Sequence, residues 1–140
     1  MDEIKATMSQ RMRRLGIALA IIACGVALRL GGYEIGLPFF LVKYGGSTLW
    51  GGMVFFLLAS LLPRQPLGRL TLLSIIAAAL IEFSRLYHTP WLDEFRLTLA
   101  GALLLGRIFS WWNIVAYALG IVIAARIENR HLARARSMPG

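Results

Sequence analysis

The stretch ALIEFSRLYHTPWLD, residues 79–93, decides how this chain is interpreted, because two charged residues, Glu82 and Arg85, lie in an otherwise apolar run. The two are three positions apart, so on a helix they share a face and can pair. In the bilayer interior each charge costs at least a few kcal/mol unless it is paired or reaches water, so such residues face the interior of a helix bundle. The pair predicts either a functional site or an ion pair that fixes helix packing.

The composition of the whole chain is typical of a membrane protein. Of its 140 residues, 58% are hydrophobic and 16% are charged, whereas about a quarter of the residues of an average soluble domain are charged. Apolar runs of about 16 to 20 residues, each near the length that crosses roughly 30 Å of hydrocarbon, take up most of the chain. The net charge of +8 comes from basic residues at the ends of these runs, so we expect no nucleic acid partner.

Four apolar runs are predicted to cross the membrane as helices. Basic clusters precede the first run and follow the last, and basic residues beside a span stay in the cytoplasm. Four spans therefore place both basic ends, residues 1–14 and 128–140, in the cytoplasm. The predicted fold class is an all-α membrane protein, with a membrane domain over residues 15–127 and spans at residues 15–30, 47–62, 70–87 and 111–127.

Two segments between the spans are predicted to be irregular elements in the outer leaflet. Residues 31–47 are rich in glycine and contain Pro38, which favours a folded hairpin. The segment from Phe95 to Arg107 is too short to cross and predicts a half-helix or a re-entrant element. A fifth span there is the alternative, but it would place the arginine-rich tail outside the cell.

Small residues at four-residue spacing predict two packing seams between helices. The single cysteine, Cys24, excludes an internal disulfide, and the preceding IIA resembles a lipoprotein signal that would be cleaved before it. That alternative would lipidate Cys24 and remove most of the first span, and the apolar run that continues beyond Cys24 argues against it. The seams are Gly16, Ala20 and Cys24 in the first span, and Ala116, Gly120 and Ala124 in the last.

The predicted topology gathers charged residues on the outer side. There five cations, Arg107 and Lys43 among them, face four acids, so full internal pairing is one interpretation. The functional interpretation is that Arg85 and Arg96 hold the phosphate of a lipid, because the guanidinium fork matches phosphate oxygens. The residues of this predicted ligand site are Glu82, Arg85, Arg96, Arg29, Asp93, Asn113 and Tyr117.

Other site types find little support in the sequence. His88 and His131 fall on opposite sides of the membrane, so we expect no metal site and no cofactor. No nucleophile with a neighbouring base and no phosphate loop is present, so we name no catalytic residues. Three tryptophans sit where spans meet the outer surface and are predicted to anchor the protein at the interface: Trp91, Trp111 and Trp112.

The stretches KYGGSTLWGGMVFFL and IEFSRLYHTPWLDEFRLTLAGALLLGRIFSWWNIVAYALG resemble a family of small bacterial multi-pass membrane proteins classed as a domain of unknown function, distantly VanZ-like. The resemblance covers residues 29–120 and implies a bacterial inner membrane. VanZ-like relatives are associated with glycopeptide susceptibility, which implies envelope or lipid chemistry. Arg85, Ser47 and Asn113 depart from the family pattern of a glutamine and two aspartates. Its most specific residues are Glu82, Phe83, Ser84, Trp91, Leu92, Asp93, Arg96 and Thr98.

Three functions remain open at this point. The first is a non-enzymatic module that binds a membrane lipid or a lipid-linked envelope precursor through Arg85 and Arg96. The second is an assembly subunit that packs against another membrane protein or a second copy of itself, its charges serving the fold alone. The third is a small transporter in which Glu82 titrates.

Overall fold

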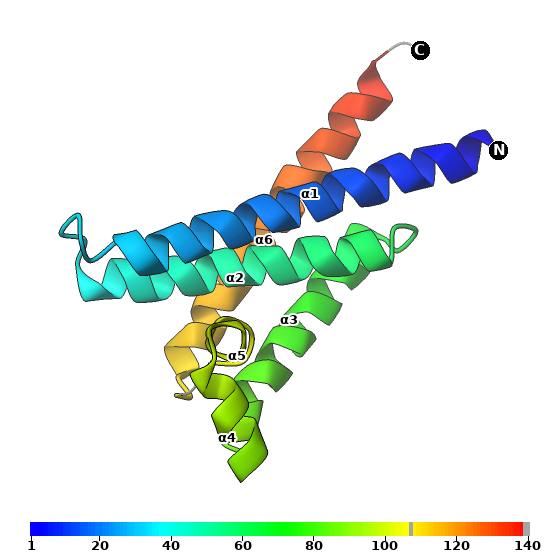
Figure 1. Ribbon diagram of the computed structural model, residues 1–140. Coiled ribbons are helices and arrows are strands. Elements are labelled where there is room, and N and C mark those ends of the chain that lie inside the picture. Colours follow the sequence, from blue (N-terminus) through cyan, green and yellow to red (C-terminus); the bar gives the residue numbers. More distant parts are fainter. Residues whose placement is uncertain (107, 139–140) are drawn as a thin grey trace.

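The computed structural model describes residues 1–106 and 108–138 (Figure 1). This part of the chain forms six helices and no strand, which confirms the all-α fold class. Four of the helices are long and apolar enough to cross a membrane, and they indicate a multi-pass membrane protein. The helices are α1 Asp2–Gly31, α2 Phe39–Leu61, α3 Leu67–Ser84, α4 Pro90–Leu97, α5 Leu99–Leu104 and α6 Trp111–Ser137.

The four predicted spans correspond to the four long helices α1, α2, α3 and α6, although α3 ends at Ser84, three residues before the predicted end of its span. Helices α1 and α6 extend beyond their apolar runs. The basic segment before residue 15 is helical and continuous with the first span, so α1 has 30 residues. The basic residues after residue 127 likewise continue α6, which has 27 residues. Arginine is a good helix former, so a basic segment can prolong an apolar helix into the interfacial layer.

The hairpin predicted over residues 31–47 is wrong in its second half. A turn follows α1, with Gly36 at φ +84°, and α2 begins directly after Pro38. Gly45 and Gly46 lie in the segment predicted as a hairpin, yet both are helical. A glycine costs a helix only about 1 kcal/mol, and a span that keeps all of its backbone hydrogen bonds internal can bear that cost.

The long helices are arranged around α2, which packs against α1, α3 and α6. In Figure 1, α1 and α2 run antiparallel side by side, α6 crosses behind them, and α3 diverges from the end of α2. Both termini lie at the same end of the molecule. We call this end the Glu128 end, and the opposite end, where α3 stops and α6 begins, the Glu82 end.

Helices α2 and α6 approach each other closely at two glycines. A Cβ added at Gly51 or at Gly120 would overlap the backbone of the facing helix, at Tyr117 and Thr48 respectively. Between helices in lipid there is little hydrophobic driving force, so such close packing supplies much of the attraction. The seam predicted on α6 is buried, whereas the one predicted on α1 is exposed to the surroundings at Gly16, Ala20 and Cys24.

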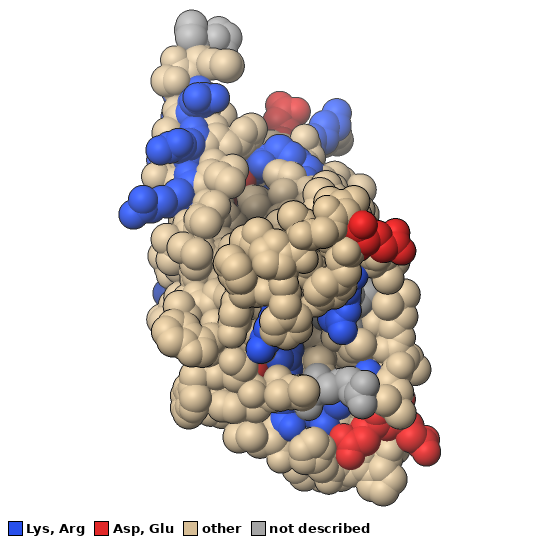
Figure 2. Space-filling view, turned by 90° about the vertical axis from the view of Figure 1, so that its left-hand side faces the viewer, with Lys and Arg blue, Asp and Glu red and all other residues tan. Residues whose placement is uncertain are grey.

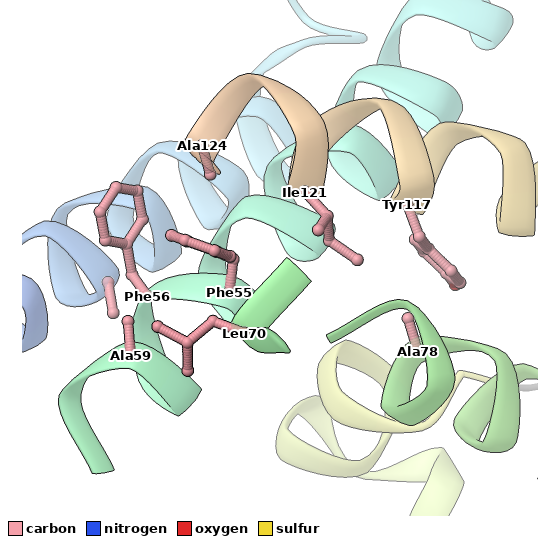
Figure 3. Close-up of a cluster of buried hydrophobic side chains, with 9 residues drawn as sticks. Phe55, Phe56, Ala59, Leu70, Ala78, Tyr117, Ile121 and Ala124 are labelled. Atoms are coloured by element: carbon pink, nitrogen blue, oxygen red, sulfur yellow. The ribbon is translucent and has the colours of Figure 1, made fainter. Parts of the chain in front are cut away.

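The core lies where the four long helices meet (Figure 3). Phe55 and Phe56 of α2 pack edge to face, with ring centres 5.4 Å apart. Ile121 of α6 belongs to the same cluster and is fully buried. Apart from Tyr117, the remaining members are small or aliphatic, which lets the helices stay close: Ala18, Ala59, Leu70, Ala78 and Ala124.

The segment predicted as a half-helix or a re-entrant element, Phe95 to Arg107, contains the end of α4 and the whole of α5, two short helices that meet at Thr98. Thr98 has an extended backbone, and its hydroxyl accepts a hydrogen bond from the Gly101 amide at 3.0 Å, which starts α5. With eight and six residues, the helices reach about 12 Å and 9 Å, so neither can cross the hydrocarbon layer. The alternative of a fifth span is therefore wrong.

Candidate functional site

The centre of the candidate site is Glu82, near the end of α3, whose side chain is fully buried. Its Oε1 accepts hydrogen bonds from the backbone amide of Ser110 at 2.7 Å and from Asn113 Nδ2 at 3.1 Å. Its Oε2 accepts one from the Tyr117 hydroxyl at 2.8 Å. The start of α6 is therefore held against the end of α3 by three donors to one carboxylate.

Arg85 supplies the opposite charge, one turn further along α3. Its Nη1 lies 2.9 Å from Glu82 Oε2, and its Nη2 donates to the Tyr117 hydroxyl at 2.9 Å. The guanidinium also donates to two backbone carbonyls after α5, at Leu105 (2.6 Å) and Ile108 (3.1 Å). Glu82 and Arg85 thus form a pair whose remaining hydrogen-bonding groups are used to fix the connection into α6.

The backbone beside Arg85 is shaped to make room for it. Gly106 has φ +69°, a left-handed conformation that side chains other than glycine rarely adopt. A Cβ added there would overlap the Arg85 guanidinium. A side chain at position 106 would therefore be disfavoured twice, by the backbone conformation and by the closeness of Arg85.

Arg96 of α4 is the second buried arginine at this end, and its side chain is 2% exposed. Its Nη2 donates to the Ser84 carbonyl at 2.6 Å, and its Nη1 donates to the Tyr87 carbonyl at 2.8 Å and to Asp93 Oδ1 at 3.0 Å. These carbonyls belong to the last turn of α3 and the residues after it, where a cation is favoured by the helix dipole. Arg96 therefore caps α3 from the neighbouring helix.

Asp93 also contacts His88, with Oδ1 3.1 Å from Nδ1. The hydrogen bond with His88, helped by the one with Arg96, holds the pKa of Asp93 below its ordinary value, against a weaker opposing effect of desolvation. This carboxyl is half exposed at the edge of α4. Asp93 belongs to the Arg96 cluster and makes no hydrogen bond with the described residues around Glu82.

The structure brings together most of the predicted site residues, but in two clusters. Glu82, Arg85, Asn113 and Tyr117 form one, and Arg96 with Asp93 forms the other, joined through the end of α3. Arg29 was expected to share the site, but it is exposed on α1 and makes none of the contacts of either cluster. Both clusters are built from residues of α3, α4 and α6 and the segments between them, and Arg107 lies outside the described residues.

The predicted interface tryptophans are all on the surface at the Glu82 end. Trp91, Trp111 and Trp112 are each about two-thirds exposed. Trp111 also belongs to an aromatic cluster with Phe83 and Phe109, with ring centres 5.0 to 5.6 Å apart. Such rings at the ends of spans are typical of an interfacial belt.

A groove of about 320 Å³ runs between α2 and α6 beside the Glu82 cluster. Ser47 donates to Asn113 Oδ1 at 3.3 Å at its upper edge, so the same asparagine that binds Glu82 also links the two walls. The Lys43 ammonium stands 5.1 Å from the centre of the Tyr44 ring, one of the lining side chains. The lining residues are Tyr44, Thr48, Trp112, Val115, Ala116 and Leu119.

A second buried ion cluster, at the Glu128 end, was not predicted from the sequence. Glu128 of α6 is fully buried and accepts from Arg13 at 2.6 Å and from Arg14 at 2.8 Å, while Arg14 also donates to the Ala59 carbonyl at 2.8 Å. The available signal was that Glu128 is the only acid after Glu94, within an otherwise basic segment. In Figure 2 other basic side chains follow the projecting end of α6.

The arrangement at the Glu82 end serves to position helices. Among the described residues there is no group of His, Cys, Asp and Glu that could hold a metal ion. The Glu82 carboxylate accepts hydrogen bonds and the Arg85 guanidinium donates them, so the two charges neutralise each other. Their contacts fix the junction of α3, α5 and α6.

Comparison with known protein families identifies the family of this chain. Residues 36–121, more than half of the sequence, match the model of the family described as protein of unknown function DUF2809. The chain belongs to the DUF2809 family. No solved structure matches it.

One of the two ion clusters lies within the residues that match the DUF2809 model, and the other lies outside them. The matched residues run from the turn before α2 to the middle of α6, so they contain the Glu82 cluster, Arg96 and the whole groove between α2 and α6. The Glu128 cluster joins α1 to the end of α6 and lies outside the matched residues. The DUF2809 part of the chain is thus the part that builds the Glu82 end.

Proposed function

We propose that this protein is a non-enzymatic membrane protein that binds an anionic lipid in the groove between α2 and α6, with the Glu82 end on the outer side of a bacterial inner membrane. The single observation that supports this is an apolar groove with a lysine, Lys43, beside its mouth. In a membrane-spanning chain, a groove on the surface of the spans faces lipid, so an acyl chain is its natural occupant.

The groove matches one acyl chain in its chemistry. Its lining combines aromatic and aliphatic side chains with Thr48, whose hydroxyl is already bonded to the Tyr44 carbonyl at 2.8 Å. From Trp112 to Leu119 it extends for two turns of α6, about 10 Å. A chain lying there leaves its headgroup at the level of Trp112, where interfacial aromatics belong.

Lys43 provides the charge for an anionic headgroup. It contacts the rings of Phe39 and Tyr44 and forms no ion pair with the described residues. A phosphate at the mouth of the groove would give the ammonium an anionic partner. This assigns the headgroup contact to Lys43 in place of Arg85 and Arg96, whose guanidinium groups are directed at internal acceptors.

The Glu82 cluster has a supporting role in this proposal. Glu82 binds Asn113 and Tyr117, and Asn113 binds Ser47, so the cluster sets the position of α6 against α2. Lipid-linked envelope precursors carry phosphate on a long apolar chain and so satisfy the same site. The resemblance of the sequence to VanZ-like proteins supports this class of ligand.

Native mass spectrometry of the protein extracted with its lipid tests the proposal. Val115 is 57% exposed and lines the groove, so Val115→Trp fills the groove without disturbing the core. Leu80→Trp, at a 65% exposed position of α3 outside the groove, is the matched control. Lys43→Gln is compared with Lys5→Gln at the opposite end.

We expect one anionic lipid to stay with the wild type and with both control variants, and to be lost from Val115→Trp and weakened in Lys43→Gln. A lysine at the membrane surface contributes about 1 kcal/mol, so Lys43→Gln should weaken retention about fivefold. Equal retention in all five proteins would overturn the proposal.

The competing function is that of an assembly subunit, and the exposed small-residue face of α1 favours it. Gly16, Ala20 and Cys24 lie on one stripe that no helix of the chain covers. Small residues at this spacing let two membrane helices approach closely. Disulfide crosslinking through Cys24 in membranes would give a discrete adduct if this face binds a second helix, and a diffuse or absent adduct would exclude it.

A further inference from the structure

We propose a second binding site, at the Glu128 end, which takes the phosphate of an anionic glycerophospholipid from the leaflet at that side. The site is a pocket of about 370 Å³ between the first turns of α1 and the turn that joins α2 to α3. It shares no residue with the groove and does not rest on the function proposed above. The residues that carry the argument are Ile4, Met8, Arg11, Leu61 and Arg64.

Arg11 is held in place by the end of α2. Its Nε donates to the Ser60 carbonyl at 3.0 Å and its Nη2 to the Leu61 carbonyl at 3.4 Å, while the Ser60 hydroxyl donates back to the Arg11 carbonyl at 3.1 Å. These contacts fix one edge of the guanidinium. Its Nη1 makes no hydrogen bond with the described residues, so it can serve a ligand in the pocket.

The pocket has a surplus of positive charge that the chain does not neutralise. Arg64 lines it, is exposed, and forms no hydrogen bond or ion pair with the described part of the chain. No aspartate or glutamate lines the pocket. The nearby Arg13 and Arg14 differ, because both bind the buried Glu128. Two guanidinium groups at one pocket therefore need an anion from outside the chain.

The level of the pocket matches that of a phospholipid phosphate. Helix α2 has 23 residues and is about 35 Å long, so its end reaches the edge of a hydrocarbon layer of roughly 30 Å. Arg11 is bonded to that end. Basic pockets between spans at this level favour anionic headgroups.

The walls of the pocket select a lipid over a free phosphate ion. Ile4, Met8 and Leu61 are 66%, 52% and 65% exposed, and all three line the pocket. A water-soluble phosphate would leave these side chains uncovered. The glycerol backbone and the first methylenes of a lipid would cover them and remove apolar surface from water.

The test measures retention of phosphatidylglycerol by the full chain in nanodiscs of phosphatidylglycerol and phosphatidylcholine, using native mass spectrometry. The pocket variant is Arg11→Gln with Arg64→Gln. The matched control is Arg130→Gln with Arg134→Gln, which removes the same charge from the exposed end of α6. Because Arg11 also bonds α2, Arg64→Gln alone is included as a variant that breaks no internal contact among the described residues.

We expect phosphatidylglycerol retention to fall about fivefold in Arg64→Gln and more than tenfold in the pocket double variant, with no change in the control. Equal losses in the pocket and control variants would mean a diffuse surface charge effect and would overturn the proposal. So would unchanged retention in Arg64→Gln. Displacement of the lipid by millimolar inorganic phosphate would overturn the choice of a lipid as the ligand, whereas failure of phosphate to compete would support it.

Discussion

Glu82 is the residue on which the Glu82 end depends, because three different segments donate to its carboxylate. Glu82→Gln leaves Arg85 buried without its counter-charge, and breaking a buried pair in this way costs about 3 kcal/mol. We expect a correspondingly lower unfolding midpoint in an SDS titration followed by circular dichroism. Glu34→Gln, at an exposed turn, is the control and should match the wild type. A Glu82→Gln protein as stable as the control would contradict the structural role of the pair.

Asp93 gives a prediction that depends on pH. Its pKa is lowered in the folded protein, chiefly by the hydrogen bond with His88, so its contribution to stability is present above the unfolded value of about 3.9. That contribution is lost as the pH falls through the folded pKa. In His88→Ala, carboxyl-carbon NMR should show the Asp93 pKa moving up toward 3.9. His131→Ala, at the other end, should leave it unchanged, and an equal shift in both would refute the local cause.

The sequence predicted part of the site at the residue scale, and its failures have a physical pattern. Glu82, Arg85, Asn113 and Tyr117 were grouped correctly because helical spacing places each pair on one face. The carbonyl acceptors of Arg85 and Arg96 could not be predicted, since they depend on loop conformation rather than on side-chain type. The Arg14–Glu128 pair joins residues 114 positions apart, and no local pattern connects them.

At the scale of the elements, the α2–α6 contact is the one most sensitive to size. Gly51→Ala places a methyl group against the backbone of Tyr117, and overpacking of this kind costs about 1–3 kcal/mol. Gly25→Ala is the control, because a Cβ there meets open space. In an SDS titration Gly51→Ala should unfold at lower SDS, and Gly25→Ala should be as stable as the wild type or more so. The opposite order would show that α2 and α6 are not in close contact.

The long helices were predictable because hydropathy and length decide them. The ends of the helices were harder to predict. A glycine can either break a helix or let two helices pack closely, and only the position of the neighbouring helix shows which of these it does. Gly51 and Gly120 face each other's helices, while Gly36 makes the turn. The boundary between the two short helices was not predicted, because nothing in the composition marks Thr98 as a break.

The whole molecule has four long helices, so both ends of the chain should lie on one side of the membrane. In a Cys24→Ser background, cysteine at Ser9 or at Ser137 should react with a membrane-impermeant maleimide only after permeabilisation of the cells. Cysteine at Glu34, at the opposite end, should react in intact cells, because basic ends stay in the cytoplasm. Labelling of all three from the same side would refute the four-span arrangement and the proposed orientation.

The Arg14–Glu128 pair also has a consequence for how the protein is made. The carboxylate that neutralises Arg14 is translated 114 positions after the arginine itself. Until then the arginine has only carbonyl acceptors such as that of Ala59, once α2 has arrived. A chain that ends before α6 therefore lacks the carboxylate that neutralises Arg14, and its α1 carries an unneutralised charge near the membrane boundary.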